Sequence, residues 1–374
     1  MAKYKKRADG RYRARVTIGY DKEGKPIVKS LYSKTIRELE VKLADFKSLL
    51  NKGVVITDNR TTLAEWAQKW LAAYKEGKSY NTFEMYEICV KKHIVTADIA
   101  QLPLNKIKEV DLQKLIIEKQ SIGLTRTVEI IVLTLKQIFR AAVKNGLIYL
   151  NPAEGLKRPE GHTEPKRPLT DIENEAILKA DLSERELAFI YLGKYAGLRR
   201  GEILALTKSD FDLKSCTVSV NKTVVFKKNN GLIKHCPKSD AGFRTIPMPD
   251  VLYDFIKCYL KDINGLCLFS MQDGGVCTKS SFRKLWDSIL KKLNIAAGGV
   301  GNIKPISGLT PHILRHDYAT NLYYAGVDIK TAQKLLGNNN IKMTLEIYTH
   351  LKQDNEDVLI KLNKRYEGQK RVNI

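Results

Sequence analysis

A proline-rich segment near the middle of the chain limits how this sequence can fold more than any other feature. Residues 151–168 hold four of the chain's eleven prolines: Pro152, Pro159, Pro165 and Pro168. Proline fixes φ and has no backbone N–H, so this segment cannot belong to a continuous helix or a central strand. We expect an extended interdomain linker that divides the 374-residue chain near residue 160. A chain of this length has room for two or three domains, each with its own core.

The first 55 residues predict a small basic domain. Two alternating runs of polar and apolar residues within residues 12–32 are separated by a turn, which is typical of a half-buried hairpin. Residues 35–50 have helical spacing, so we expect a small sheet backed by one helix. Arginines on the open face of such a sheet suit the major groove of DNA, and the alternative is a solvated basic hairpin. The arginines that share this face are Arg11, Arg13 and Arg15.

Residues 61–158 predict a second domain that is entirely helical. Thr62 and Glu65 have the spacing of a capping box at the start of a helix. Pro103 and Gly123 interrupt the helical pattern further along. The polar faces are rich in lysine, and Lys91 and Lys92 are candidate DNA-binding residues. Helices are expected near 62–75, 79–94, 109–121 and 125–145.

Residues 166–374 predict a mixed but mainly helical domain. Capping boxes at Thr170 to Glu173 and Ser183 to Glu186 mark its first two helices. The glycine-rich loop at 297–302 follows a helix rather than a strand, so we expect a mobile loop and not a nucleotide cradle. Helices are expected at 171–181, 184–196, 250–261, 279–293, 311–324, 328–336, 341–350 and 355–366, and strands at 216–226, 231–236 and 243–247.

The charge of the chain indicates the class of partner. Lys and Arg number 64 against 41 Asp and Glu, which gives a formal charge of +23 and favours a polyanion. No apolar run approaches the roughly 20 residues of a membrane span, and no secretory signal opens the chain. The six cysteines lack CxxC spacing, which is typical of reduced thiols in a cytoplasm and not of a zinc site.

A possible anion site lies near the C-terminal end. Thr310 and Pro311 predict the start of a helix, because Pro fits the first helical position. His312 and Arg315 then share one face of that helix. An imidazole beside a guanidinium on a buried helix suits a phosphate group. The alternative is an ordinary amphipathic helix with a surface His and Arg.

Four short motifs follow one another in this domain. They are Gly197-Leu198-Arg199 with Glu202, Pro237-Lys238 before Arg244-Thr245-Ile246-Pro247, His312 with Arg315, and Tyr348 with His350. Their order and spacing resemble the tyrosine recombinase family, the integrases of phages and conjugative transposons, and the resemblance is specific over residues 196–350. It implies an α-helical core-binding domain over 61–158 and a mixed α+β, mainly helical catalytic domain over 166–374. For residues 1–55 it is looser and implies a three-stranded sheet plus helix that binds arm-type DNA sites.

The resemblance also implies residue roles. Tyr348 would attack the phosphodiester and form a 3′-phosphotyrosine, which stores the bond energy for rejoining. Arg199 and Arg315 would hold the non-bridging oxygens as charge develops on them. Lys238 would protonate the leaving 5′ oxygen, and His312 would take or relay the tyrosine proton. No metal and no cofactor is expected, because the arginines supply the positive charge.

Other residues are expected to support this chemistry. Glu202 would orient the pocket, and Arg244 is a candidate DNA contact. Structural roles are expected for His316 and His350.

One position departs from the family pattern. Asn338 stands where the family usually has a second histidine, and asparagine can donate a hydrogen bond to a phosphate oxygen but cannot carry a proton. We therefore expect Asn338→His to raise the cleavage rate or leave it unchanged, with more gain at lower pH. Asn338 is also the one feature that favours a DNA-binding regulator of recombinase descent with little cleavage. A topoisomerase is a third interpretation.

The expected partners follow from the resemblance. They are double-stranded DNA with core and arm-type attachment sites, further copies of the chain as a dimer or tetramer on DNA, and an excisionase or DNA-bending accessory protein. We expect no membrane partner and a bacterial, cytoplasmic protein associated with the nucleoid.

Overall fold

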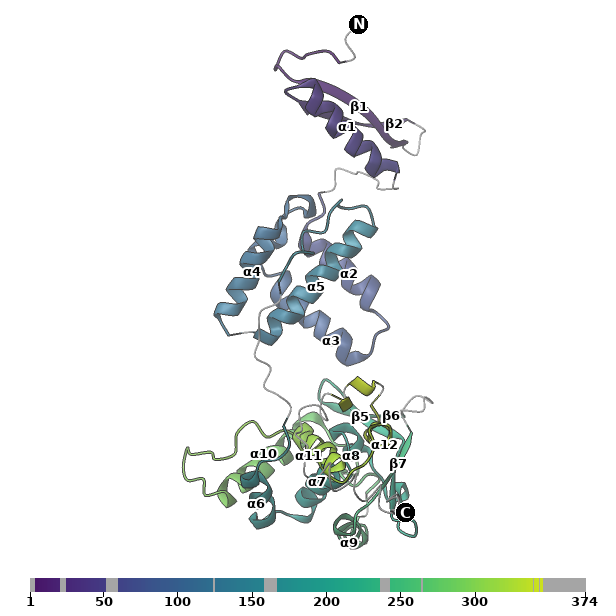
Figure 1. Ribbon diagram of the computed structural model, residues 1–374, viewed down its shortest axis with the longest axis vertical. Coiled ribbons are helices and arrows are strands. Elements are labelled where there is room, and N and C mark those ends of the chain that lie inside the picture. The colour runs from purple at the N-terminus through teal and green to yellow at the C-terminus, as the bar shows by residue number, and fades with distance from the viewer. Residues whose placement is uncertain are drawn as a thin grey trace, which may run out of the picture. The chain divides into compact units, whose positions relative to one another are not determined.

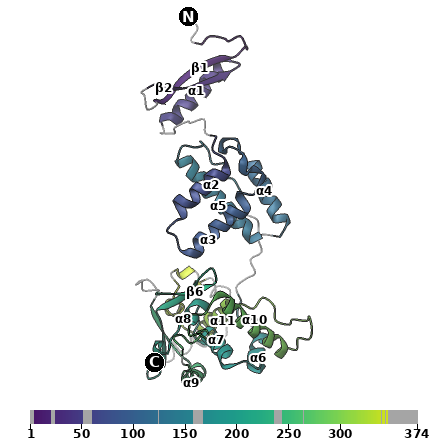
Figure 2. The same cartoon turned by 180° about the vertical axis from the view of Figure 1, so that it is seen from behind.

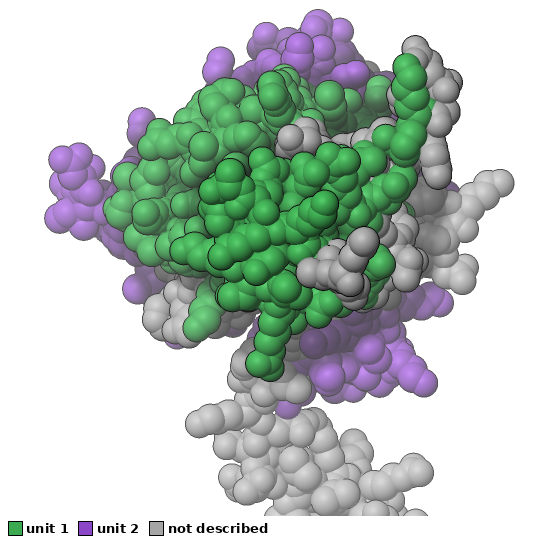
Figure 3. Space-filling view, turned by 90° about the horizontal axis from the view of Figure 1, so that it is seen from above, with its two compact units in different colours: residues 1–163 green, residues 164–374 purple. Residues whose placement is uncertain are grey.

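The chain forms two compact units, residues 1–163 and 164–374, in the computed structural model (Figure 1; seen from behind in Figure 2). Figure 3 colours the first unit green and the second purple. No helix among the described residues is both long and apolar enough to cross a membrane. The structure describes residues 4–20, 25–51, 60–123, 125–157, 167–235, 243–263, 265–338, 340–342 and 344–345.

A two-stranded antiparallel sheet packed on one helix opens the first unit. The apolar residues Ala14, Leu39 and Phe46 are buried between the sheet and the helix. Arg15 is exposed, so the strand alternates as predicted. The elements are β1 (Tyr12–Tyr20), β2 (Pro26–Ser33) and α1 (Ile36–Asn51).

For the described part of this sheet, the prediction of a third strand is wrong. The sheet contains β1 and β2, and the segment before them adds a single bridge between Lys6 and Tyr12. A tight turn follows Lys6 at once: Arg7 N–H donates to the Arg11 carbonyl, and Gly10 adopts a φ of 75°. The chain therefore reverses before a longer ladder can form.

The helical part of the first unit follows the predicted pattern. The Thr62–Glu65 capping box is present, with bonds of 3.1 and 3.2 Å between backbone N–H groups and side-chain oxygens. Trp70 is 2% exposed, and the Trp66 ring N–H donates to the Ile138 carbonyl, which joins the first and last helices. The helices are α2 (Leu63–Lys75), α3 (Tyr80–Cys89) with a π-helical turn at Val90–Ile94, α4 (Glu109–Ser121) and α5 (Thr125–Lys144), with 3₁₀ turns at Asp98–Gln101 and Leu104–Lys106.

The second unit encloses one large apolar core between helices and two small sheets. Both capping boxes predicted for its first two helices are present. The helices are α6 (Asp171–Lys179), α7 (Glu184–Tyr195), α8 (Arg200–Ala205), α9 (Asp250–Tyr259), α10 (Lys279–Ala296), α11 (Pro311–Tyr324) and α12 (Ile329–Leu336), with a 3₁₀ turn at Lys208–Asp210. The strands are β3 (Phe211–Asp212), β4 (Thr217–Val220), β5 (Lys222–Lys227), β6 (Asn230–His235) and β7 (Arg244–Pro247).

The single strand expected over 216–226 is in fact two strands. β4 pairs with β3 and β7, whereas β5 forms a separate hairpin with β6. The break falls at Asn221, whose amide donates to the buried Asp210 at 3.2 Å. Lys222 donates to the same carboxylate at 2.6 Å, so Asp210 holds the point where the chain changes sheets.

Helices α7 and α11 lie side by side and position the polar residues described below (Figure 1). Gly197, just after α7, has a φ of 61°, and a Cβ there would come within 2.2 Å of the Tyr318 ring. On the same helix as Tyr318, the Asp317 carboxylate accepts from the Leu169 N–H at 3.2 Å and from Lys194 at 3.0 Å. The end of the proline-rich linker is therefore bonded to the middle of α11.

Candidate functional site

Arg315 on α11 is almost completely buried, with 7% of its surface exposed. Its Nη1 donates to the Gly197 carbonyl at 2.7 Å, and its Nη2 donates to the Leu336 carbonyl and to Asn338 Oδ1, the latter at 3.0 Å. Burial and the neighbouring charge of Arg199 lower the pKa of Arg315 to about 9, so the guanidinium stays charged at neutral pH.

Arg199 lies at the start of α8 and reaches the same amide from a different helix. Its Nη1 donates to Glu202 at 2.8 Å, and its Nη2 donates to the Gly337 carbonyl at 2.7 Å and to Asn338 Oδ1 at 3.2 Å. The structure thus brings together Arg199 and Arg315, which are far apart in the sequence, on one amide oxygen.

Each of these two guanidinium groups has more N–H groups than it uses in these hydrogen bonds. A guanidinium has five N–H groups, and Arg199 and Arg315 each use three of them in the bonds above. The remaining two N–H groups of each side chain donate to no atom of the residues that the structure describes. Two positive groups that meet at one amide and have spare donors are suited to an anion with several oxygens, such as a phosphate.

Asn338 accepts hydrogen bonds from the arginines, which differs from the role expected from the sequence. It follows Gly337, whose left-handed backbone (φ 58°) ends α12. Its Oδ1 receives both guanidinium groups, while its Nδ2 donates to Thr344 Oγ1 at 3.1 Å. The donor end of the amide therefore points away from the arginines. The sequence alone contains no signal for this orientation, because it depends on residues far from Asn338.

Arg244 is buried, contrary to the DNA contact that we expected. Its exposed fraction is 5%, its Nη1 and Nη2 donate to Glu202 at 3.1 and 2.6 Å, and its Nε donates to the Leu335 carbonyl at 2.8 Å. Burial alone would raise the pKa of Glu202, but the bonds and charges of Arg244 and Arg199 lower it to about 2. Glu202 is therefore an anion that links Arg244 to Arg199.

His312 lies one turn before Arg315 on α11, at the exposed start of the helix. Pro311 occupies the first helical position as predicted, whereas the Thr310 side chain makes no capping bond. Desolvation by the surrounding protein, followed by the charges of Arg315, Arg200 and Arg199, lowers the pKa of His312. The imidazole is therefore neutral at pH 7 and able to accept a proton.

Three other residues of the predicted site cannot be placed in this geometry. Lys238, Tyr348 and His350 lie outside the residues that the structure describes. Their predicted roles remain predictions.

The predicted DNA-binding residues of the first unit lie on its surface and differ in their pairing. Arg11 donates to Asp9 at 3.0 Å, whereas Arg15 is exposed and Arg13 is partly buried. Lys91 forms an ion pair with Glu87 at 2.7 Å, and Lys92, the next residue, is exposed.

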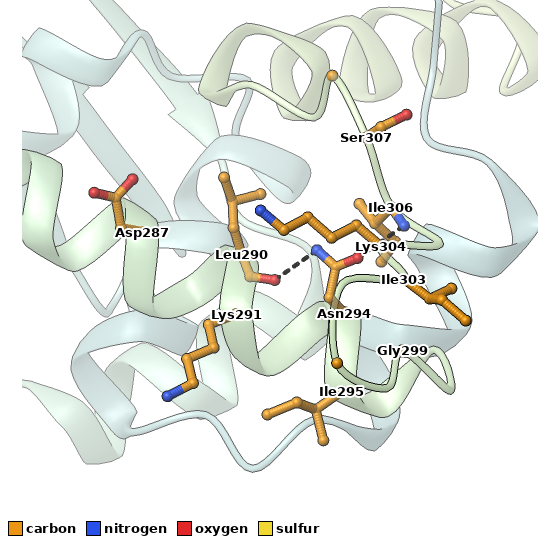
Figure 4. Close-up of a pocket in the computed structure, with 12 residues that line it drawn as sticks. Asp287, Leu290, Lys291, Asn294, Ile295, Gly299, Ile303, Lys304, Ile306 and Ser307 are labelled. Atoms are coloured by element: carbon orange, nitrogen blue, oxygen red, sulfur yellow. Dashed lines mark hydrogen bonds between the residues drawn. The ribbon is translucent and has the colours of Figure 1, made fainter.

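A cavity of about 730 Å³ lies beside α10, and its lining does not include the arginines (Figure 4). The loop at 297–302, expected to be mobile, forms part of its wall. Asn294 Oδ1 accepts from the Ile306 N–H at 3.0 Å, while Asn294 Nδ2 donates to the Leu290 carbonyl at 2.9 Å. Gly299 fits against this wall because a Cβ there would come within 2.7 Å of the Asn294 carbonyl.

Comparison with known proteins gives two family matches. The Phage integrase family model matches residues 167–355, and the model of the phage integrase N-terminal SAM-like domain matches residues 62–120. The chain is 28% identical over 379 residues to a protein named tyrosine recombinase XerC-like from Caldanaerobacter subterraneus subsp. tengcongensis, with 93% of this chain and 94% of that protein covered.

Two solved structures share the fold. The integrase of transposon Tn1549, in complex with a circular intermediate DNA, superposes with a TM-score of 0.69 at 23% identity, covering 81% of this chain and 99% of that one. A lambda integrase tetramer bound to a Holliday junction superposes with a TM-score of 0.58 at 17% identity, covering 95% of this chain and 97% of that one.

Proposed function

Because the chain belongs to the phage integrase family, the tyrosine recombinases, we propose that it is a site-specific recombinase that integrates and excises a mobile element. The observation that carries this proposal is the convergence of Arg199 and Arg315 on one oxygen, each with two N–H groups to spare. The similarity to a transposon integrase supports the proposal that the DNA it integrates and excises is a mobile element.

The reaction that we propose exchanges one phosphodiester for another. Tyr348 Oη attacks the scissile phosphorus, and the bond from phosphorus to the 5′ oxygen breaks, which leaves a 3′-phosphotyrosine. Neutral His312 takes the tyrosine proton, and Lys238 gives a proton to the leaving 5′ oxygen. Arg199 and Arg315 hold the non-bridging oxygens through their spare donors as negative charge accumulates. Rejoining is the reverse sequence with another 5′ hydroxyl as the nucleophile.

Glu202 and Arg244 act behind this pair. The Glu202 carboxylate holds the Arg199 Nη1 at 2.8 Å and is itself held by both ends of Arg244. We propose that Arg244 does not contact DNA. It fixes the charge and position of Glu202, and Glu202 in turn orients Arg199.

The domain roles are part of the same proposal. Residues 1–55 bind arm-type sites, residues 61–158 form the core-binding domain, and residues 166–374 form the catalytic domain. The tail helix expected at 355–366 lies outside the residues that the structure describes. The SAM-like match over 62–120 supports the second assignment. Double-stranded DNA is the substrate, and the lambda integrase tetramer on a Holliday junction supports assembly of dimers and tetramers on DNA. An excisionase or a DNA-bending protein would set direction, and the protein would act at the bacterial nucleoid.

A nicked suicide substrate tests the activity directly. Cleavage next to the nick releases a short strand, so the covalent protein–DNA adduct cannot reverse and migrates slowly on a denaturing gel. Tyr348→Phe removes only the hydroxyl, so we expect DNA binding to persist and the adduct to vanish. Adduct formation by Tyr348→Phe would assign the nucleophile to another tyrosine. Specific binding by the native chain without any adduct would favour the DNA-binding regulator instead.

A further inference from the structure

The orientation of the Asn338 amide is fixed by its surroundings on both sides. Its Oδ1 lies 3.2 Å from Arg199 Nη2 and 3.0 Å from Arg315 Nη2, and both of these groups are donors. The opposite orientation would place an NH₂ group against two guanidinium groups, with donor facing donor and no acceptor between them. The amide oxygen must therefore face the arginines, and the NH₂ group must find its acceptor elsewhere.

Thr344 supplies that acceptor from the segment that leads to the predicted nucleophile. Its exposed fraction is 0%, and its Oγ1 accepts from Asn338 Nδ2 at 3.1 Å. Asn338 is itself held at the backbone, because Gln333 Nε2 donates to its carbonyl at 2.9 Å. Thr344 precedes Tyr348 by four residues in the sequence, and Tyr348 lies outside the described residues.

We propose that Thr344 is a positioning residue that connects the segment preceding Tyr348 to Arg199 and Arg315 through the Asn338 amide. The two guanidinium groups fix which end of the amide faces them, and the amide in turn fixes where Thr344 lies relative to them. This inference rests on the proposed recombinase activity and adds to it a residue that touches neither DNA nor the reacting atoms.

The physical basis is the polarity of a neutral amide. A protonated histidine at position 338 would offer donors only, so it could not accept from the two guanidinium groups. Asparagine presents an acceptor on one side and a donor on the other, and each side has one kind of partner here. The arginine pair and the Thr344 segment are thus joined by one side chain, and a change at Thr344 acts on the arginines through it.

The experiment measures the single-turnover rate of adduct formation on the nicked substrate, together with the Kd for the same DNA. Thr344→Val keeps the shape of the side chain and removes its acceptor, so the rate should fall by about tenfold, the effect of one ordinary hydrogen bond. The Kd should change by less than about twofold, because Thr344 does not touch DNA. Thr344→Ser keeps the hydroxyl and should restore most of the rate.

A matched control comes from another buried threonine. Thr134 on α5 is also 0% exposed, and its hydroxyl donates to the Ile130 carbonyl at 2.7 Å. Thr134→Val removes a buried hydroxyl from the same full-length protein and should leave the cleavage rate unchanged. Equal rate losses in Thr134→Val and Thr344→Val would assign the effect to general destabilisation and overturn the proposal.

A double-mutant cycle distinguishes a positioning role from independent effects. If Thr344 acts through Asn338, Thr344→Val should cost little further rate once Asn338→Ala has removed the amide. A full tenfold loss in both backgrounds would overturn the proposal, as would a Thr344→Val enzyme that cleaves at the native rate. Absence of adduct from the native protein is a different result, because it would reject the recombinase activity itself.

Discussion

Glu202 accepts hydrogen bonds from both ends of the Arg244 guanidinium, at 3.1 and 2.6 Å, and each of the two residues is 5% exposed. A buried carboxylate needs such a partner, because without it the charged form would be strongly disfavoured. Arg244 therefore keeps Glu202 ionised beside Arg199. Arg199, which donates a further bond to this carboxylate, is held in place by a residue that never reaches DNA.

The first prediction concerns stability in acid. The pKa of Glu202 is lowered from 4.5 to about 2, so its stabilising contribution is fully present above pH 4.5 and is lost as the pH falls toward 2. The shift corresponds to about 3 kcal/mol of unfolding free energy. Glu202→Gln should be less stable at pH 7 and lose less stability between pH 4.5 and 2, as measured by denaturant unfolding.

Glu175→Gln serves as the control for that measurement. Glu175 pairs with Lys179 at 2.5 Å, but both side chains are more than 60% exposed, so water screens the pair. Its replacement should leave the unfolding midpoint nearly unchanged. A Glu202→Gln protein with native stability at every pH would show that the buried pair does not stabilise the fold.

The second prediction concerns Arg315. Lysine in its place keeps a positive charge but cannot span Gly197, Leu336 and Asn338 with a planar fork. Arg315→Lys should slow adduct formation by about 10²–10³, the usual effect of losing one oxyanion donor. DNA binding should weaken far less, and Arg283→Lys, on an 83% exposed side chain of α10, should cleave at the native rate. If Arg315→Lys cleaves at the native rate, the scissile phosphate does not bind at Arg315.

The third prediction concerns the pH dependence of cleavage. The pKa of His312 lies below its ordinary 6.5, so the neutral imidazole persists at pH 6.5 and is lost only as the pH falls through the lowered value. Arg200 contributes one of the charges responsible and lies over the rings of Phe226 and Phe282. Arg200→Gln should move the acidic limb of the rate profile upward, toward pH 6.5. A limb that stays in place would show that another group controls it.

The fourth prediction concerns the N-terminal sheet. Deleting residues 1–55 should abolish binding to arm-type sites and leave cleavage of a short core site intact. Removing one phosphate-binding side chain reduces the slope of log K against log salt by about 0.9. Arg15→Ala should reduce the slope for arm-type DNA, whereas Arg37→Ala, an equal charge change on α1, should not. Equal effects of the two substitutions would mean that the domain binds DNA through its general positive charge and not through this face of the sheet.

The fifth prediction reverses an expectation from the sequence. Asn338 accepts from two guanidinium groups, and only a neutral imidazole could do the same. Asn338→His should therefore cleave faster as the pH rises from about 6 to 8, not as it falls. Asn338→Asp should cleave more slowly at every pH, because its charge would pair with the arginines and compete with the DNA phosphate. A higher cleavage rate of Asn338→His at low pH would contradict this prediction and support the original expectation that residue 338 donates to the phosphate.

Features set by neighbouring residues could be predicted from the sequence. Thr62 and Glu65, or Ser183 and Glu186, are three residues apart, so their capping boxes depend on one helical turn and both formed as expected. The spacing of the motifs also predicts that Arg199 and Arg315 share one site, and the structure brings both to the Asn338 amide oxygen, while their catalytic roles stay predictions.

Features set by distant contacts could not be predicted in this way. The burial of Arg244 depends on Glu202, 42 positions earlier, and the orientation of Asn338 depends on Arg199, 139 positions earlier. The division of residues 216–226 into two strands depends on Asp210, which lies outside that run and holds Lys222. In each case the local pattern allows the observed state and its alternative, and a partner elsewhere decides between them.

The Leu169 N–H donates to Asp317 on α11, so its proton can serve as a probe of the contact between Leu169 and this helix. That proton exchanges with deuterium only when the bond opens, and Asp317 belongs to the same helix as His312 and Arg315. Its exchange rate therefore reports how often this contact with the helix opens, from a position outside the helix. Whatever tightens α11, a bound DNA site included, should slow deuterium uptake at Leu169, at the very end of the linker.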